Sequence, residues 1–148
     1  MIDLTIQKGV LSLHSKAELM NDLCDIVLKW EGFADDEKAK QLAFSYIHEI
    51  ERENTLVAGQ TPSRPYYRVD ITVPENAISN SNKSDLIGEV TDCILKAEQS
   101  GCNSENRSRV WCIIHHVLDG NWGGKGKVFP YNALRNRLLK AKKNNQNT

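Results

Sequence analysis

Residues 2–6 alternate strictly between apolar and polar side chains, which predicts a strand with one buried face. A helix is expected next, beginning near Ser15, with Glu18 as its capping-box partner. Apolar residues then recur at helical spacing: Leu19, Leu23, Ile26, Val27 and Trp30. A second strand is predicted at residues 44–48, so this part of the chain reads as strand, helix, strand.

The same pattern occurs twice. Residues 2–60 align with residues 69–127 at a constant offset of 67 positions without a gap, and 13 of the 59 aligned residues are identical. Such self-similarity indicates two copies of one structural unit. The predicted organisation is a single compact domain made of a first βαβ module (1–60), a linker leading into a strand (61–68), a second βαβ module (69–127) and a basic C-terminal tail (128–148).

The two strands of a βαβ unit run parallel, and their helix covers one face. Two fused units therefore predict an α/β fold, with a four-stranded sheet and two helices on one face. The second copy closes with residues 110–114, which are apolar on both faces. Strands of this kind are normally covered twice, which predicts a homo-oligomer that buries the helix-free side of the sheet. The alternative is an unusually apolar exposed sheet.

The charge balance excludes several function classes. The chain has 148 residues with 19 basic and 19 acidic side chains, a net charge of zero. Residues 132–148 carry five basic residues and no acid, so the tail is +5 and residues 1–131 are −5. A neutral total argues against a nucleic-acid partner or an anionic membrane surface. The basic tail is expected to do no more than solubilise the terminus.

The sequence also lacks the marks of export and of metal binding. No segment is apolar for the roughly 20 residues of a membrane span, and the start at Met1 predicts no signal peptide. The four cysteines form no CxxC pair, and two of them fall in apolar periodic segments. His115 and His116 point to opposite faces of a strand and cannot chelate one ion together. We therefore expect a cytoplasmic protein with reduced thiols and no metal or other cofactor.

Three features together resemble the tautomerase superfamily, in particular fused (tandem) 4-oxalocrotonate tautomerase-like proteins: the strand opening at residues 2–6, the duplication, and residues 110–115 leading into Gly120-Asn121-Trp122-Gly123. The resemblance covers residues 1 to about 127. It implies a tautomerase/MIF-like fold and a homotrimer of fused chains, a pseudo-hexamer. It also implies isomerisation of a small carboxylate substrate, with an amino-terminal proline as the base.

That proline is absent here. Met1 is followed by Ile2, so the free amine is that of Met1 or of a residue before it, and its ordinary pKa already lies near working pH. The resemblance implies substrate-binding arginines after the first strand and early in the second. Lys8 and Glu75 stand at the first of these positions. Arg109 lies two residues before Trp111, where it is expected to reach the same space.

The predicted site is therefore the Met1 α-amine as base, with Lys8, Arg109, Trp111, Asn121 and Trp122 binding substrate. The predicted function is a tautomerase-like isomerase acting on a small 2-oxo acid or enol. The alternative is a catalytically degenerate trimer that binds a small acid or a protein partner. Asp3 and Asp70, paired by the repeat, are expected to find partners such as Arg68. The segment Gly123–Lys127 is predicted to be a β-turn, because it lacks the context of a phosphate loop.

Overall fold

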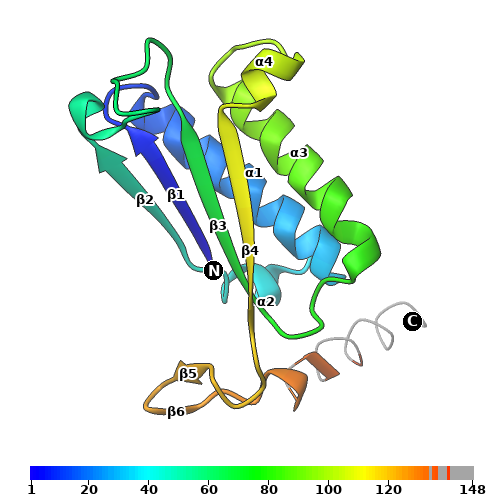
Figure 1. Cartoon of the computed structure of the whole chain (residues 1–148). Coiled ribbons are helices and arrows are strands. Elements are labelled where there is room, and N and C mark those ends of the chain that lie inside the picture. The colour runs from blue at the N-terminus through cyan, green and yellow to red at the C-terminus, as the bar shows by residue number, and fades with distance from the viewer. Residues whose placement is uncertain (134, 137–139, 141–148) are drawn as a thin grey trace.

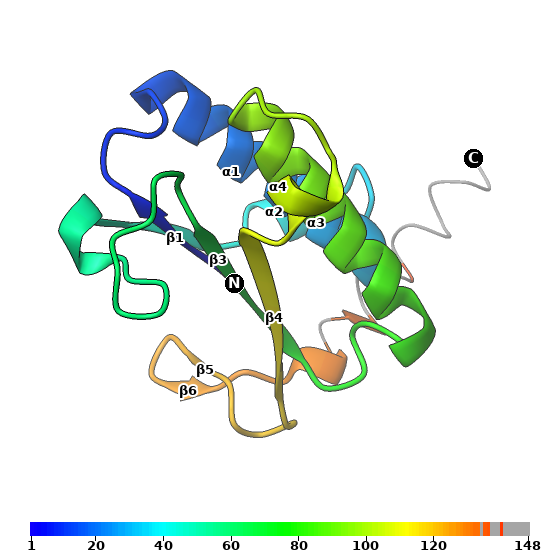
Figure 2. The same cartoon turned by 45° about the horizontal axis from the view of Figure 1, so that its top comes forward.

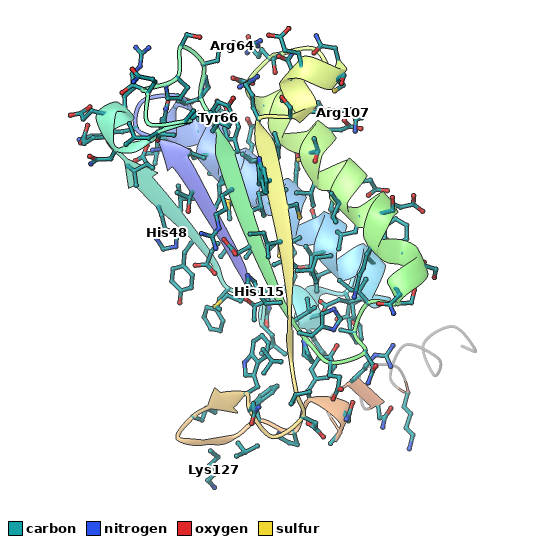
Figure 3. All side chains as sticks on the ribbon, viewed as in Figure 1. His48, Arg64, Tyr66, Arg107, His115 and Lys127 are labelled. Carbon is teal, nitrogen blue, oxygen red and sulfur yellow. The ribbon has the colours of Figure 1, made fainter. Side chains whose placement is uncertain are left out.

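The computed structural model describes residues 1–133, 135, 136 and 140 (Figure 1). Its main sheet has the order β2-β1-β3-β4. The strands are β1 (Ile2–Gln7), β2 (Ser45–Ile50), β3 (Tyr67–Pro74) and β4 (Val110–Val117). Strands β1 and β2 are parallel, β3 and β4 are parallel, and the two pairs meet antiparallel at β1 and β3. Helices α1 (Leu13–Glu31) and α3 (Lys83–Ala97) both lie on one face of this sheet (Figures 1 and 2), which confirms the predicted architecture.

The sequence repeat is also a repeat in space. Thr5 pairs with His48 in the first unit, and Thr72 pairs with His115 in the second, each at the same offset of 67. Where the units meet, Asp3 lies directly opposite Asp70. The two units are therefore related by an approximate twofold axis through the β1–β3 pair.

The core lies between the sheet and the two helices. It consists of the inward-facing residues of β1 and β3 together with one face of each helix, including Leu4, Ile71, Leu23 and Leu86, none of which is exposed. Burial of these apolar side chains is the main stabilising contribution to the fold. Residues of β4 that face the helices, such as Cys112, pack against this core.

The helix-free face is more polar at its centre than the sequence predicted. The His48 imidazole lies 2.9 Å from the Asp3 carboxylate, and His115 lies 2.6 Å from Asp70. The Arg68 guanidinium pairs with Asp70 at 2.8 Å, as expected from the sequence. These contacts offset the repulsion between two carboxylates that face each other across the strands. Large apolar side chains on this face lie on the edge strands, as Tyr46 on β2 and Trp111 on β4.

Several predicted boundaries were wrong. Helix α1 begins three residues earlier than its cap was placed, because the Ser12 hydroxyl accepts a hydrogen bond from the Ser15 amide at 3.0 Å. Ser12 is therefore the N-cap, and Ser15 lies inside the helix. Strand β2 runs from residue 45 to residue 50 instead of 44–48, and β4 continues three residues beyond the predicted 110–114.

The remaining elements are short. They are α2 (Glu37–Lys40), η1 (Arg52–Asn54), η2 (Asn80–Asn82), α4 (Ser104–Arg107), β5 (Gly123–Gly124) and β6 (Lys127–Val128). The β5–β6 hairpin confirms the predicted turn. Lys125 and Gly126 both have positive φ, 54° and 71°, as a two-residue hairpin of this type requires.

The chain is helical again from Tyr131, one residue before the predicted start of a tail helix at Asn132. The predicted frayed end, residues 143–148, lies outside the described residues. Within the described part of the chain, no helix has both the length and the apolar character needed to cross a membrane.

Candidate active site

The amino terminus lies where β1 begins, beside the middle of β3 (Figure 1). The Met1 amine donates a hydrogen bond to the Thr72 carbonyl oxygen at 2.9 Å, and the Thr72 amide donates to the Met1 carbonyl at 2.9 Å. Two reciprocal backbone contacts therefore extend the ladder to the first residue and fix the position of the amine.

Burial changes the acid–base behaviour of this amine. Desolvation lowers the pKa of the Met1 amine below its ordinary value, and the negative charge of Glu31 opposes this effect. Glu31 is the last residue of α1, which runs back along the sheet to the end where β1 begins. Its own carboxyl is desolvated, and burial raises the pKa of Glu31 to about 7, although the amine and Arg135 favour its ionised form. Near neutral pH, both groups therefore lie close to their titration points.

Two residues of the tail complete this cluster. The Tyr131 hydroxyl and the Nε atom of Arg135 are buried, and neither has a hydrogen-bond partner among the described residues. Burial, together with the charge of Glu31, raises the pKa of Tyr131 to about 12, while Arg135 acts in the opposite direction. Met1, Glu31, Tyr131 and Arg135 are thus close enough to influence one another electrostatically; they are called the amine cluster below.

The turn after β4 lies next to Tyr131. Trp122 is half-buried and, with Tyr131, Glu75 and Val117, lines a hollow of about 20 Å³, which is the size of one water molecule. Asn121 beside it is exposed. Trp122 therefore lies at the Met1 end of the molecule and contributes to the boundary of the amine cluster.

Three other predicted site residues lie elsewhere. Lys8 follows the opposite end of β1, where its ammonium pairs with Glu51 at 2.7 Å and remains largely exposed. Trp111 is exposed on the helix-free face. Arg109 is buried at the start of β4, at the same end as Lys8. A single chain therefore separates Lys8 and Arg109 from Met1 by the length of the sheet.

The expectation that Arg109 reaches the space of Trp111 was wrong. The Arg109 guanidinium makes two hydrogen bonds to the Glu98 carboxylate, at 2.9 and 2.7 Å, and one to the Pro65 carbonyl at 2.6 Å. Arg109 precedes the first residue of β4 and follows the short helix α4, so strand alternation does not govern its direction. This guanidinium holds the chain together and has no face open to a ligand on the Trp111 side.

Sequence reasoning missed Glu31, Tyr131 and Arg135. One signal was present, since Glu31 and Glu98 are identical residues of the two repeat copies. The tail residues gave no signal of their own, because their position depends on how the tail folds back to the Met1 end. Among the described residues, no group of three or more histidine, cysteine or acidic side chains is arranged to hold a metal ion.

An amine with a lowered pKa has a larger unprotonated fraction at neutral pH, and it can then accept a proton. A neighbouring carboxyl that titrates near pH 7 can hold or return one. The amine cluster is therefore suited to proton transfer on a small molecule bound beside Met1.

Searches with the sequence found no matching family model and no matching curated protein. Solved structures do match the fold. A structure described as Pt0534 inactivated by 2-oxo-3-pentynoate is similar at a TM-score of 0.72 and 18% identity, over 88% of this chain and 97% of that one. A wild-type fused 4-OT symmetric trimer matches at 0.69 and 14% identity, over 89% and 97%. A member of the cis-3-chloroacrylic acid dehalogenase family matches at 0.67 and 12% identity, over 93% and 99%. The chain thus has the tautomerase-type fold that its resemblance implied.

Proposed function

We propose that the chain is a tautomerase-like isomerase of small 2-oxo acids or their enols, with the Met1 α-amine as the group that moves the proton. The observation that carries this proposal is the amine of lowered pKa, fixed by Thr72 and adjacent to Glu31. The shared fold supports the proposal at the level of the reaction class, because function depends on the site and not on the fold alone.

The proposed reaction is a proton transfer with no net change in atoms. The unprotonated amine accepts a proton from the enol hydroxyl, and the resulting ammonium donates a proton to the adjacent carbon as the electron pair moves there. The product is the 2-oxo acid, and the amine is regenerated. Positioned acid–base groups of this kind contribute roughly 10²–10⁴-fold in rate.

The direct test uses the probe named for the similar structure. We expect 2-oxo-3-pentynoate to form one adduct per chain, on the amino-terminal peptide, and to abolish ketonisation of phenylpyruvate enol. An unprotonated amine is nucleophilic, whereas the ordinary lysine pKa near 10.4 keeps ε-amines protonated at pH 7. Intact mass before labelling establishes that the purified chain begins at Met1, and peptide mass spectrometry after labelling locates the adduct.

Protein whose α-amine has been acetylated is the matched control and should remain unlabelled and inactive. Full turnover by the acetylated protein, or labelling elsewhere with Met1 unmodified, would contradict the role of this amine. A correctly started chain that neither turns over the enol nor reacts would leave the degenerate, binding-only trimer as the better description.

We also propose that the working form is a homotrimer. In one chain Lys8 lies at the far end from Met1, so it can act on a substrate at Met1 only from another copy. The similar fused 4-OT structures include trimers. The exposed aromatic edges of the helix-free face, at Tyr46 and Trp111, are the surfaces that such an assembly would bury.

Trp111→Glu is accordingly expected to shift the protein from trimer to monomer in sedimentation velocity at micromolar concentration. A charge placed in an apolar interface is costly to desolvate. Leu13→Glu is the matched control, because Leu13 is 82% exposed at the start of α1, and this variant should sediment as the wild type does. A trimeric Trp111→Glu protein, or a monomeric wild type, would contradict this assembly.

A further inference from the structure

The two copies of the repeat place the same group of residue types at opposite ends of the sheet. In the second copy, Glu98 lies beside Tyr67 and Arg109. In the first copy, the equivalent residue Glu31 lies beside Tyr131 and Arg135, although both of these come from the tail. Each end of the molecule thus has one glutamate, one tyrosine and one arginine.

The second-copy group is closed. The Arg109 guanidinium and the Glu98 carboxylate form a two-bond ion pair, and their side chains are only 4% and 13% exposed. Burial alone would raise the pKa of Glu98, but the hydrogen bonds from Arg109 and Ser100 hold it below its ordinary value. The carboxylate and the guanidinium satisfy each other, and a charged ligand would have to displace one of them.

The first-copy group is open. No ion pair within 4.0 Å joins Arg135 to Glu31 in the described part of the chain, and the pKa of Glu31 is raised where that of Glu98 is lowered. The Arg135 Nε atom and the Tyr131 hydroxyl are buried without a hydrogen-bond acceptor among the described residues. A buried donor without a partner costs free energy, whereas an acceptor placed between these two would recover it.

The charge balance of the open group favours an anion. Met1 and Arg135 contribute two positive charges when the amine is protonated, and Glu31 contributes at most one negative charge. Asp3 and Cys24 also act on the amine, and Lys40 of α2 acts on Cys24. A monocarboxylate would bring the excess positive charge close to neutrality, and arginine binds carboxylates particularly well because its planar donors match both oxygens.

We propose that Tyr131 and Arg135 form a carboxylate-binding subsite beside the Met1 amine, which takes the carboxylate of a small 2-oxo acid or aryl-substituted acid. The inference rests on the proposed function for the identity of the ligand and on the amine cluster for its place. The tail, and not the strand positions expected from the sequence, thereby supplies the arginine. The 20 Å³ hollow between Tyr131 and Trp122 is smaller than such a ligand, so binding must shift the tail outward.

The test measures binding of phenylacetate, which cannot tautomerise, by titration calorimetry at pH 6.5. Arg135→Gln should weaken binding about 10–100-fold, as expected for loss of hydrogen bonds to a charged group. Tyr131→Phe, which removes only the hydroxyl, should weaken it about 3–10-fold. The matched controls are Lys140→Gln, which removes a charge from an exposed tail residue, and Tyr46→Phe on the helix-free face. Both should bind as the wild type does.

Enol turnover separates the two proposals. If Arg135→Gln raises KM by the same factor and leaves kcat nearly unchanged, the subsite is supported as a ground-state binding group. If the wild type turns over the enol but Arg135→Gln alters neither KM nor phenylacetate affinity, the subsite is wrong and the amine mechanism stands. If phenylacetate binds through Arg135 without any enol turnover, the subsite stands and the isomerase proposal fails. Equal weakening in Lys140→Gln would also overturn it, because the effect would then be one of net charge. Thermal melting confirms that each variant is folded.

Discussion

Arg109→Ala is expected to lower the free energy of unfolding by about 3–5 kcal/mol, the cost of leaving one buried ion without its partner. Arg109 is 3% exposed, and its guanidinium supplies both bonds that satisfy the Glu98 carboxylate. The same guanidinium also binds the Pro65 carbonyl, which fixes the chain just before β3 begins. Its removal would leave a buried carboxylate and loosen the connection between the two repeat copies.

The measurement is urea denaturation at a fixed protein concentration, since assembly makes apparent stability depend on concentration. Arg64→Ala is the matched control, because Arg64 pairs with Glu105 at 3.3 Å with both side chains exposed. An exposed pair of this kind contributes at most about 1 kcal/mol. Arg109→Ala with Glu98→Leu should recover part of the loss, because no charge is then left unpaired. Equal losses in the two single variants would show that Arg109 is not a structural ion.

The fold was predictable because its determinants are local and repeated. The alternation of residues 2–6, the helical spacing after it and the constant offset of 67 together specify two parallel pairs and two helices on one face. Errors occurred at element ends, where one hydrogen bond decides the boundary. Ser12 and Ser15 are both good cap residues, and only the structure shows that the Ser12 hydroxyl accepts from the Ser15 amide.

The candidate site was less predictable because its members meet through packing between distant parts of the chain. Sequence spacing correctly marked Met1 and Trp122 as lying near one end of the sheet. It could not show that Arg109 turns into the Glu98 ion pair, since the short helix α4 resets the direction of the chain before β4. Nor could it place Tyr131 and Arg135 beside Glu31, which is about 100 residues earlier in the chain. The basic tail therefore looked like a solubilising segment.

Glu31→Gln is expected to raise the free energy of unfolding by about 2 kcal/mol at pH 8 and to leave it unchanged at pH 4. Burial raises the pKa of Glu31 from 4.5 to about 7, so the folded protein binds this proton more tightly than the unfolded chain does. Below pH 4.5 the carboxyl is protonated in both states and costs nothing. As the pH rises through 4.5 toward 7, the unfolded chain ionises first and stability is lost; above pH 7 the full penalty is present. A shift of this size corresponds to about 3 kcal/mol, reduced here because Glu31 is partly accessible to water.

Urea denaturation of both proteins at pH 4, 6 and 8 gives the required difference. Glu18→Gln is the matched control, since Glu18 is exposed on the same helix and its replacement should change stability by no more than about 0.5 kcal/mol at any pH. The same substitution should strengthen phenylacetate binding at pH 8, because it removes the one acidic group from a cluster that otherwise contains the Met1 amine and Arg135. A Glu31→Gln protein that is less stable than the wild type at pH 8 would mean that Glu31 forms a stabilising ion pair with those cations. In that case the first-copy group is closed like its Glu98 counterpart, and Arg135 is not available to a ligand.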